Sequence, residues 1–588
     1  MTVVGFSSEE VRSKNKGAKL VPTISIKKKD LERLSGISFT LDEIELHLQL
    51  VKGEFKGYDP AKDELRVELG DSNRPDLWCC EGIARQIRGK LKGEWSDYTF
   101  FNKNASDKAG DIIVSEGMKE IRPFVGGFTA TGISVDDEML VQLIQTQEKI
   151  SEIFGSKRRR ISIGIYNLSN MSFPVYYNAV NPDETAFTPL GFEEKMTLKE
   201  ILEKHPKGQA YGNILKGLSK FPLLTDSKNN VLSFPPVINS RELGEVKVGD
   251  TELFVEVTGL DLRLVTLVLN ILAVNLNDRG ASIGIVETVY PYETEFGKNV
   301  GIPFDFITPL TLSIRDAEKA IGEKLSLDEV ASLLDGYGYQ VKKKADSLDV
   351  TPPPFRDDIM HPIDVCEDIA ISRGYNTFTP VMPSVMTVGG LTEIEMFTDL
   401  VRGHMIGSGF QEIISNILTS KEDILEKMCL TEGKVVEVDN VMSANYSVLR
   451  HWVVPSLMRI EAESIKSFFP HKTFETGETA IPDPSHNLSS STLIKCAAML
   501  SHPGANFSEI HSVLEILMYY LQIEYRLVAG NHKSFIEGRM GCVYAGDNIV
   551  GLIGEIHPEV LRRWDIHMPC SAFELDLDKL LKLYIEKR

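Results

Sequence analysis

The chain has 588 residues, which is long enough for several folded domains of about 100 to 200 residues each. Its 42% hydrophobic and 25% charged residues exclude a disordered or fibrous chain, because that balance is typical of globular proteins. The formal net charge of -20 excludes a protein that coats nucleic acid by bulk charge, although a local basic track remains compatible with it.

The amino-terminal part of the chain predicts a short leader followed by an α+β domain. Residues 1–21 are polar and basic without hydrophobic periodicity, so we expect them to be flexible. In residues 22–110, the strand-like segment ISIKKKDL precedes a helical pattern of leucine and isoleucine. The segment DSNRPDLWCCEGIARQIRGKL (residues 71–91) then predicts a helix, because its first residues can cap one. We interpret its adjacent Cys79 and Cys80 as core residues.

Residues 111–300 mix short strands and helices, and we expect them to form one mixed domain. FPLLTDSKNNVLSFPP (residues 221–236) predicts a β-hairpin, because two apolar runs flank a turn-forming stretch. ELFVEVTGLDL (residues 252–262) predicts a buried strand that carries an acid, Glu256. The alternative is that this acid points to solvent from one face of the strand.

Neither a membrane span nor a secretory signal is visible in the sequence. The most apolar run, LVTLVLNILAVNL (residues 264–276), is too short to cross a bilayer, so we expect a buried helix closed by Gly280. Seven cysteines without a CxxC pair argue against a disulfide scaffold or a zinc ribbon and favour a reducing compartment. We therefore expect a cytoplasmic protein.

The remaining chain is expected to hold two further domains, residues 301–382 and 383–588. The first contains a predicted helix (residues 326–339), and the second opens with a predicted helix (residues 391–410) and an apolar strand (residues 412–420). Because helices do not alternate regularly with strands, we expect a multidomain α+β fold with mainly antiparallel sheets.

The stretch FRDDIMHPIDVCEDIAISRGYN (residues 355–376) concentrates acids at a predicted helix start. Pro362 suits the first helical position, and Gly374 suits the position after the helix end. Three acids at i, i+3 and i+4 share one helix face, and a fourth precedes the helix. These four acids are Asp358, Asp364, Glu367 and Asp368, with Asp357 as a spare.

Two interpretations of these acids remain open. The helix dipole favours an acid in the first turn by about 0.3–1 kcal/mol, so the acids can decorate a solvated helix end. Alternatively they bind a cation, and their oxygen atoms would select magnesium or calcium. In either case the opposite helix face is expected to pack inward through Ile363, Cys366, Ile369 and Ala370.

Five separated motifs resemble the beta subunit of phenylalanyl-tRNA synthetase, with the archaeal and eukaryotic cytosolic branch as the closer match. They are RDDIMHPIDVCEDIAISRGYN, DSNRPDLWCCEGIARQIRG, SKRRRISIGIYNL, FPLLTDSKNNVLSFPPVINS and SFIEGRMGCVYAGDNIVGLIGEIHPEVL. The resemblance runs from about Pro22 to about residue 580. It implies an enzyme of two alpha and two beta subunits that joins phenylalanine to tRNA(Phe) with ATP and magnesium, with the aminoacylation site on the alpha subunit.

The resemblance also implies two sites on this chain. One is a magnesium site in the module of residues 301–382, with Asp358, Asp364, Glu367 and Asp368 as ligands. The other is an editing site in residues 111–300 that hydrolyses mischarged tyrosyl-tRNA(Phe), because an apolar pocket rejects an added hydroxyl by only about a hundredfold. Glu256 matches the acid that accepts the phenol. Further matching positions are Ser233, Leu223 and Leu224 and, more weakly, Thr258, Gly259 and Asn239.

Residues 383–588 resemble a class II synthetase catalytic domain. A working site of that class needs arginines that meet the developing charge on phosphate. KTFETGE (residues 472–478) and GLIGEIHPEVL (residues 551–561) contain no arginine. We therefore expect a silent copy kept for assembly, without catalytic residues for aminoacylation, in which His557 is structural.

Two rival functions are weighed against this interpretation. A magnesium-dependent phosphoryl-transfer enzyme would need a nucleotide cradle, but no GxxxxGK[ST] loop occurs. A binding scaffold without chemistry would use the acidic stretch as a structural ion site. The basic run from Lys157 to Arg160 either touches RNA phosphate, contacts an acidic partner subunit, or is a solvated charge run.

Overall fold

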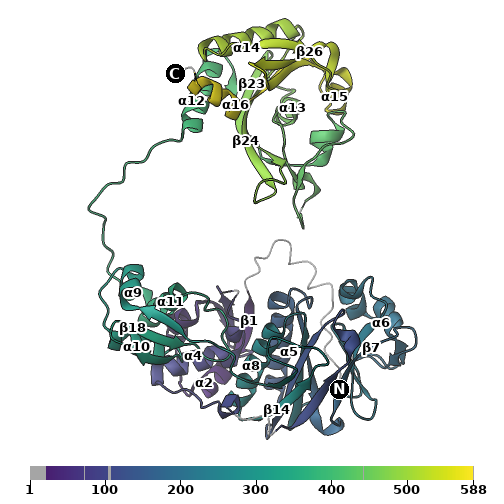
Figure 1. The fold of residues 1–588 in the computed structure, drawn as a ribbon, viewed down its shortest axis with the longest axis vertical. Helices are drawn as coiled ribbons and strands as arrows, with labels where there is room; N and C mark the ends of the chain where they lie inside the picture. The colour runs from purple at the N-terminus through teal and green to yellow at the C-terminus, as the bar shows by residue number, and fades with distance from the viewer. Residues whose placement is uncertain (1–21, 72, 103–107, 442, 587–588) are drawn as a thin grey trace. The chain divides into compact units, whose positions relative to one another are not determined.

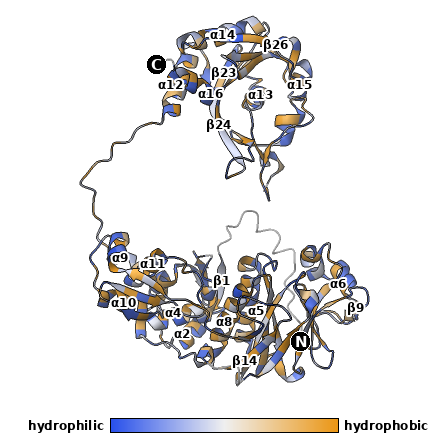
Figure 2. Cartoon of the chain, viewed as in Figure 1, coloured by the Kyte–Doolittle hydropathy of each residue, from blue (hydrophilic) through white to orange (hydrophobic). Residues whose placement is uncertain are grey.

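The computed structural model describes residues 22–71, 73–102, 108–441 and 443–586. The leader predicted for residues 1–21 lies outside them. The chain divides into two compact units, Met1–Val381 and Met382–Arg588. Figure 2 shows that hydrophobic and hydrophilic residues are interleaved in the elements of both units, as expected when each element buries one side against a neighbour.

The first unit begins with a three-stranded antiparallel sheet of order β1-β3-β2, against which helices pack (Figure 1). The strand predicted in ISIKKKDL ends at Lys27, earlier than expected, and a helix follows directly. Leu31 and Leu34 of that helix are buried at helical spacing, which a strand would place on opposite faces. The elements are β1 (Thr23–Lys27), α2 (Lys28–Ser35), α3 (Leu41–Leu48), β2 (Gly53–Asp59), β3 (Glu64–Leu69) and α4 (Cys80–Lys92).

A ten-stranded mixed sheet follows, with the order β12-β11-β10-β7-β4-β14-β5-β13-β6 and β15 paired to β14. The predicted hairpin is confirmed as β10 and β11. β13 lies between β5 and β6 and pairs antiparallel with both, so it is an interior strand. The strands are β4 (Gly110–Val114), β5 (Phe124–Thr131), β6 (Ile161–Asn167), β7 (Val175–Val180), β10 (Phe221–Thr225), β11 (Val231–Phe234), β12 (Ile238–Asn239), β13 (Glu252–Gly259), β14 (Ser282–Val289) and β15 (Asn299–Ile302).

The predicted apolar helix is confirmed as α8 (Leu262–Asp278), which packs against β5 and β13. Its Asn270 side chain donates to two backbone carbonyls, at 2.8 and 2.9 Å, and its Asn275 side chain donates to Cys79 Sγ at 3.2 Å. Both asparagines are therefore buried with partners. Among the described residues, no helix combines the length and apolarity that a bilayer crossing requires. The other helices here are α5 (Asp137–Lys149), α6 (Leu198–Lys204) and α7 (Pro206–Tyr211).

One hydrophobic core runs through the amino-terminal sheet and the ten-stranded sheet, from Ile24 to Phe355. Cys79 and Cys80 are buried between them, as predicted. The last part of the first unit has a core of its own, from Leu312 to Ile371, under the three-stranded sheet β16-β18-β17. Its elements are β16 (Leu310–Ser313), α9 (Ile314–Ile321), α10 (Leu327–Asp335), β17 (Gln340–Lys343), β18 (Ser347–Thr351) and α11 (Pro362–Arg373).

The second unit is built on a seven-stranded sheet of order β19-β23-β24-β28-β27-β26-β25, antiparallel except where β19 meets β23. Helices α12, α14 and α16 pack on one another and on this sheet. The elements are α12 (Glu393–Gly407), β19 (Gln411–Glu412), β20 (Leu418–Thr419), β21 (Val436–Glu437), β22 (Val448–Leu449), α13 (Val454–Glu463), β23 (His471–Pro482), β24 (Ser490–Ser501), α14 (Phe507–Tyr520), β25 (Arg526–Ala529), β26 (Phe535–Ala545), β27 (Asn548–Ile556), α15 (Pro558–Arg563), β28 (Cys570–Asp576) and α16 (Leu577–Glu586).

The apolar strand predicted at residues 412–420 is wrong for most of its length. Only its ends are in strands, and Ile414 between them is 91% exposed. The backbone N–H of Ser415 donates to the Glu475 carboxylate instead of to a neighbouring strand. At Ser415 a hydrogen bond to a side chain replaces the backbone hydrogen bond of a sheet. The hydrophobicity of the segment does not reveal this. The predicted multidomain α+β class itself is confirmed.

Candidate functional site

The acid predicted in the buried strand lies inside the protein. Glu256 is 2% exposed at the centre of β13, and its register neighbours are Gly127 of β5 and Gly164 of β6. A Cβ at Gly164 would lie 2.4 Å from Glu256 Oε1 and 2.2 Å from the Tyr166 hydroxyl. The glycine in ISIGIYNL therefore leaves the space that the carboxyl occupies. The alternative that this acid points to solvent is wrong.

The Glu256 carboxyl has one bonded oxygen and one without a partner. The Tyr166 hydroxyl donates to Oε1 at 2.9 Å, whereas Oε2 is buried and has no partner among the described residues. Burial raises the pKa of Glu256 to about 8, against the opposing effects of the Tyr166 hydrogen bond and the Arg122 charge. Near neutral pH the carboxyl is mainly protonated, so it can both donate to and accept from a polar group of a ligand.

Glu256 shares a small cavity with two other predicted residues, Ser233 and Asn239. The cavity measures about 20 Å³, which is room for about one water molecule. Ser233 Oγ is also buried, without a well-aligned partner in the described part of the chain. Two buried polar atoms thus line one cavity. Glu256 Oε2 lacks a partner among the described residues, and Ser233 Oγ has a poorly aligned contact with the Tyr166 side chain, whereas buried polar groups normally have well-made hydrogen bonds. This arrangement is typical of a site prepared for a polar ligand group.

The other four residues predicted for this pocket, Leu223, Leu224, Thr258 and Gly259, do not line it. Leu224 pairs with Ser233 across the hairpin, and Leu223 belongs to a neighbouring apolar cluster. The Thr258 hydroxyl accepts a hydrogen bond from Arg122 Nε at 3.0 Å. Leu224 and Thr258 therefore neighbour lining residues in the sheet, since Leu224 pairs with Ser233 and Thr258 lies two residues from Glu256.

Arg158 also lines the cavity, and the sequence placed it only within a basic run. Its Nη1 donates to the carbonyl oxygens of Pro236, at 3.2 Å, and Val237, at 3.0 Å. Its guanidinium lies 4.3 Å from the centre of the Tyr211 ring. Arg158 is half-buried whereas Glu256 and Ser233 are buried, so it lies on the outer side of the cavity. The basic run was the feature of the sequence that could have identified Arg158. Whether the Arg158 side chain lies against the cavity or in solvent depends on the fold.

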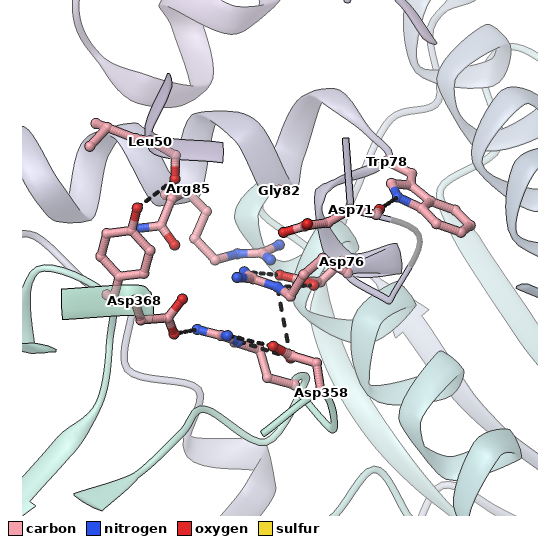
Figure 3. Close-up of polar contacts among 12 residues, drawn as sticks. Leu50, Asp71, Asp76, Trp78, Gly82, Arg85, Asp358 and Asp368 are labelled. Atoms are coloured by element: carbon pink, nitrogen blue, oxygen red, sulfur yellow. Dashed lines mark hydrogen bonds and ion pairs between the residues drawn. The ribbon is translucent and has the colours of Figure 1, made fainter. Parts of the chain in front are cut away.

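Two of the four predicted metal ligands share a buried arginine. Arg356 donates from Nη1 to Asp368 at 2.6 Å, and from Nε and Nη2 to Asp358 at 3.1 and 2.6 Å. Figure 3 shows Asp358 and Asp368 directed at this group, with Asp76 close by. Burial opposes the ionisation of Asp358, but Arg356 and Arg74 hold its pKa below the ordinary value. The carboxylates are thus neutralised by protein groups.

The other two predicted ligands point elsewhere. Asp364 accepts the backbone N–H groups of Met360 and His361, at 2.9 and 2.8 Å, and caps α11. Glu367 forms an ion pair with Lys52, which directly precedes β2 of the amino-terminal sheet. No group of three or more His, Cys, Asp or Glu side chains in the described ranges is arranged to hold a metal ion. The oxygen donors suit magnesium chemically, but the fold does not bring the four together.

The helix itself is as predicted, with Pro362 at its start and Gly374 after its end. Cys366 and Ile369 are buried on its inward face, as predicted, but two residues differ from the prediction. Ile363 is 52% exposed, whereas Asp368 is only 5% exposed. Asp368 can be buried because Arg356 and the Tyr339 hydroxyl both donate to it. The three acids on α11 therefore do not share one face open to a cation.

An arginine does stand beside KTFETGE, although the sequence motif lacks one. Arg450 is 1% exposed, and its Nη1 lies 2.8 Å from Glu475 Oε1 on β23. It also donates to Ser415 Oγ and to the carbonyl oxygen of Glu478, at 2.8 and 2.9 Å. A guanidinium that is buried and already paired is not exposed to a phosphate. His557 accepts the backbone N–H of Glu559 and so caps α15, which is a structural role.

Comparisons with known proteins agree with these motifs. The family described as "tRNA synthetase B5 domain" matches residues 310–375, and the family "Phenylalanyl tRNA synthetase beta chain CLM domain" matches residues 379–577. A solved N-terminal fragment of the phenylalanyl-tRNA synthetase beta subunit from Pyrococcus horikoshii is 36% identical, with a TM-score of 0.57, and covers 60% of this chain and all of that fragment. The fold and the matched domains define a subunit of an aminoacyl-tRNA synthetase.

Comparison with curated proteins narrows this class of synthetase subunits to one family. The phenylalanine–tRNA ligase beta subunit of Borreliella burgdorferi (strain ZS7) is 40% identical over 551 residues, 93% of this chain and 97% of that protein. The one from Borrelia garinii subsp. bavariensis is 38% identical over 565 residues, 95% of this chain and all of that protein. The chain belongs to the phenylalanine–tRNA ligase beta-subunit family. Because these relatives are bacterial and the Pyrococcus fragment is a structural neighbour, the archaeal and eukaryotic branch stays a prediction.

Proposed function

We propose that this chain supports the ATP-dependent attachment of phenylalanine to tRNA(Phe) by an alpha subunit, and that it hydrolyses tyrosyl-tRNA(Phe) at the Glu256 cavity. The family implies an alpha-subunit partner. In the proposed assembly, two alpha and two beta subunits act in the cytoplasm. ATP and phenylalanine bind to the alpha subunit, since Arg450 in the second unit is already paired.

The buried carboxyl carries the editing proposal. Tyrosine differs from phenylalanine by one hydroxyl, so a site that prefers tyrosine needs a polar atom with no other partner. Glu256 Oε2 is such an atom, and Ser233 Oγ lines the same cavity. Phenylalanine would leave the buried Glu256 Oε2 without a partner, at a cost of about 1–3 kcal/mol. The geometry therefore supports selection of a phenol.

The cavity must enlarge before a tyrosine side chain can enter, since about 20 Å³ holds roughly one water molecule. Arg158, Ile238 and Asn239 are the half-exposed residues of its lining, and their displacement would open it toward solvent. No side chain of the lining is placed as a general base. In the proposed reaction, a positioned water attacks the ester carbonyl carbon, and the bond from that carbon to the ribose oxygen breaks. Free tyrosine leaves, the ribose oxygen takes up a proton from the water, and the neighbouring terminal ribose hydroxyl of the tRNA assists this transfer.

The four carboxylates predicted to bind magnesium, Asp358, Asp364, Glu367 and Asp368, take no part in this reaction. Each of them already has a cationic or N–H partner. The binding-scaffold alternative differs from the editing proposal in one respect, because a scaffold would leave mischarged tRNA intact.

Replacement of Glu256 by alanine tests the editing proposal. We expect Glu256→Ala to slow the hydrolysis of tyrosyl-tRNA(Phe) by about one to two orders of magnitude, because the phenol loses its buried partner. Phenylalanine attachment by the complex with the alpha subunit should be unchanged. The measurement is the release of labelled tyrosine from purified tyrosyl-tRNA(Phe).

Glu252→Ala is a matched control, because Glu252 stands on the same strand but is absent from the cavity lining. It should hydrolyse tyrosyl-tRNA(Phe) at the parent rate. If the Glu256 variant and the parent accumulate equal amounts of mischarged tRNA, the assignment of Glu256 is wrong. If the parent itself fails to release tyrosine, the scaffold interpretation is favoured.

A further inference from the structure

The basic run lies in a tight loop between α5 and β6 that reaches the Glu256 cavity. Ser156, Lys157 and Arg158 all have positive φ, at 51°, 54° and 63°. Residues other than glycine rarely adopt the left-handed conformation, and three in succession are unusual. The surrounding structure must therefore impose this conformation. The loop is therefore a shaped part of the site.

Backbone contacts fix the loop to the wall of the cavity. The carbonyl oxygen of Arg159 accepts from Arg122 Nη1 at 3.1 Å, and that of Arg160 accepts from the N–H of Leu260 at 3.1 Å. Arg122 also donates to Thr258, two residues from Glu256 on β13. Since Arg158 itself lines the cavity, the loop adjoins the cavity directly.

Three of the four cations in this loop are free. Lys157, Arg159 and Arg160 are exposed, and within the described residues none of them forms an ion pair. Arg158 differs, because its guanidinium is bound to the carbonyl oxygens of Pro236 and Val237. On a chain with a net charge of -20, Lys157, Arg159 and Arg160 place three exposed positive charges, which form a local positive patch, within two residues of Arg158 in the cavity lining.

We propose that the side chains of Lys157, Arg159 and Arg160 bind backbone phosphates of a single-stranded RNA end and bring its terminal ester to the Glu256 cavity. This inference rests on the proposed editing function and adds its RNA contact. Arginine can grip a phosphate through two N–H groups and lysine binds it as a point charge, so both residue types suit this role. An acidic protein surface could satisfy the same charges, but the patch adjoins the cavity where the RNA-linked ester must arrive.

The test is the variant K157Q/R159Q/R160Q in the full chain, purified with its alpha subunit. We expect the KM for hydrolysis of tyrosyl-tRNA(Phe) to rise on the order of tenfold at about 0.15 M salt, with kcat within about twofold of the parent. Loss of three contacts to a single strand should also lower the slope of log affinity against log salt by about 2. Binding of a short single-stranded RNA, followed by fluorescence anisotropy, measures that slope without requiring hydrolysis.

A matched variant removes the same charge elsewhere. Arg315, Lys319 and Lys342 are exposed in the last part of the first unit, and R315Q/K319Q/K342Q should keep the parent KM and slope. Equal KM and slope in parent and loop variant would overturn the RNA contact even where the parent hydrolyses tyrosyl-tRNA(Phe). Loss of the alpha subunit during purification, with KM unchanged, would assign the patch to a protein partner instead. Failure of the parent to hydrolyse contradicts the editing function, and the anisotropy slope then decides the RNA contact by itself.

Discussion

At the residue scale, the central finding is the buried carboxyl group of Glu256. Among the described residues only one of its two oxygens has a hydrogen-bond partner. Glu256 lies between Gly127 and Gly164, which leave room for it in the middle of a sheet. Tyr166 satisfies one of its oxygens, and the other has no partner among the described residues. Such a group costs stability, so its presence indicates a function in binding.

That cost predicts a pH dependence of stability. Because the pKa of Glu256 is about 8 when folded and ordinarily 4.5, the folded state holds a proton that the unfolded state releases in this range. The free energy of unfolding should therefore fall as the pH rises from about 4.5 to about 8, and Glu256→Gln should remove this fall. The measurement compares urea midpoints of parent and variant between pH 5 and 8. A difference that stays constant with pH would contradict the raised pKa.

At the scale of elements, α11 shows how a correctly predicted helix can present an unexpected face. Its boundaries follow from Pro362 and Gly374, which the sequence displays. Asp368, however, turns inward onto Arg356, which precedes the helix. The acids of α11 thus have three kinds of partner: Arg356 for Asp368, backbone N–H groups for Asp364, and Lys52 for Glu367.

Removal of Arg356 tests this interpretation. We expect Arg356→Leu to destabilise the first unit by about 3–5 kcal/mol, because Asp358 and Asp368 would be left buried with too little positive charge. The exposed Arg315→Leu should change stability by no more than about 0.5 kcal/mol. Urea unfolding followed by circular dichroism measures both.

The same unfolding experiment distinguishes two explanations: the acids are neutralised by arginine and other protein groups, or they are neutralised by a bound magnesium ion. If protein groups neutralise these acids, the parent midpoint should be equal in magnesium chloride and in EDTA. A large upward shift with magnesium would instead support an ion among Asp358, Asp364, Glu367 and Asp368, since a ligand that binds the folded state raises its stability.

At the scale of the whole molecule, the chain divides into two compact units. The segment from residue 379 to 392 has no regular structure, and Val381, Met386 and Val388 in it are more than 80% exposed. The Pyrococcus fragment, which covers 60% of this chain, shows that a comparable amino-terminal part can be crystallised by itself. The first unit is therefore expected to fold without the second.

Limited proteolysis tests the independence of the units. We expect an early cut between residues 379 and 392 that yields two folded fragments, because exposed chain without sheet or helix hydrogen bonds is the preferred site of cleavage. Mass spectrometry locates the cut, and circular dichroism follows each fragment. If the amino-terminal fragment unfolds once it is cut off, the two units depend on each other.

Local features of the sequence determined several elements of this protein, although not the strand predicted at residues 412–420. The apolar run of α8, the hairpin β10–β11 and the ends of α11 were predictable, because periodicity, turn residues and capping act over a few neighbouring positions. Only the tertiary structure decided where charges meet. Arg356 binds Asp368 and Arg450 binds Glu475 across the fold, and the loop of Arg158 closes on the cavity of Glu256. The physical reason is that pairing and burial of a charge depend on distances between segments far apart in sequence.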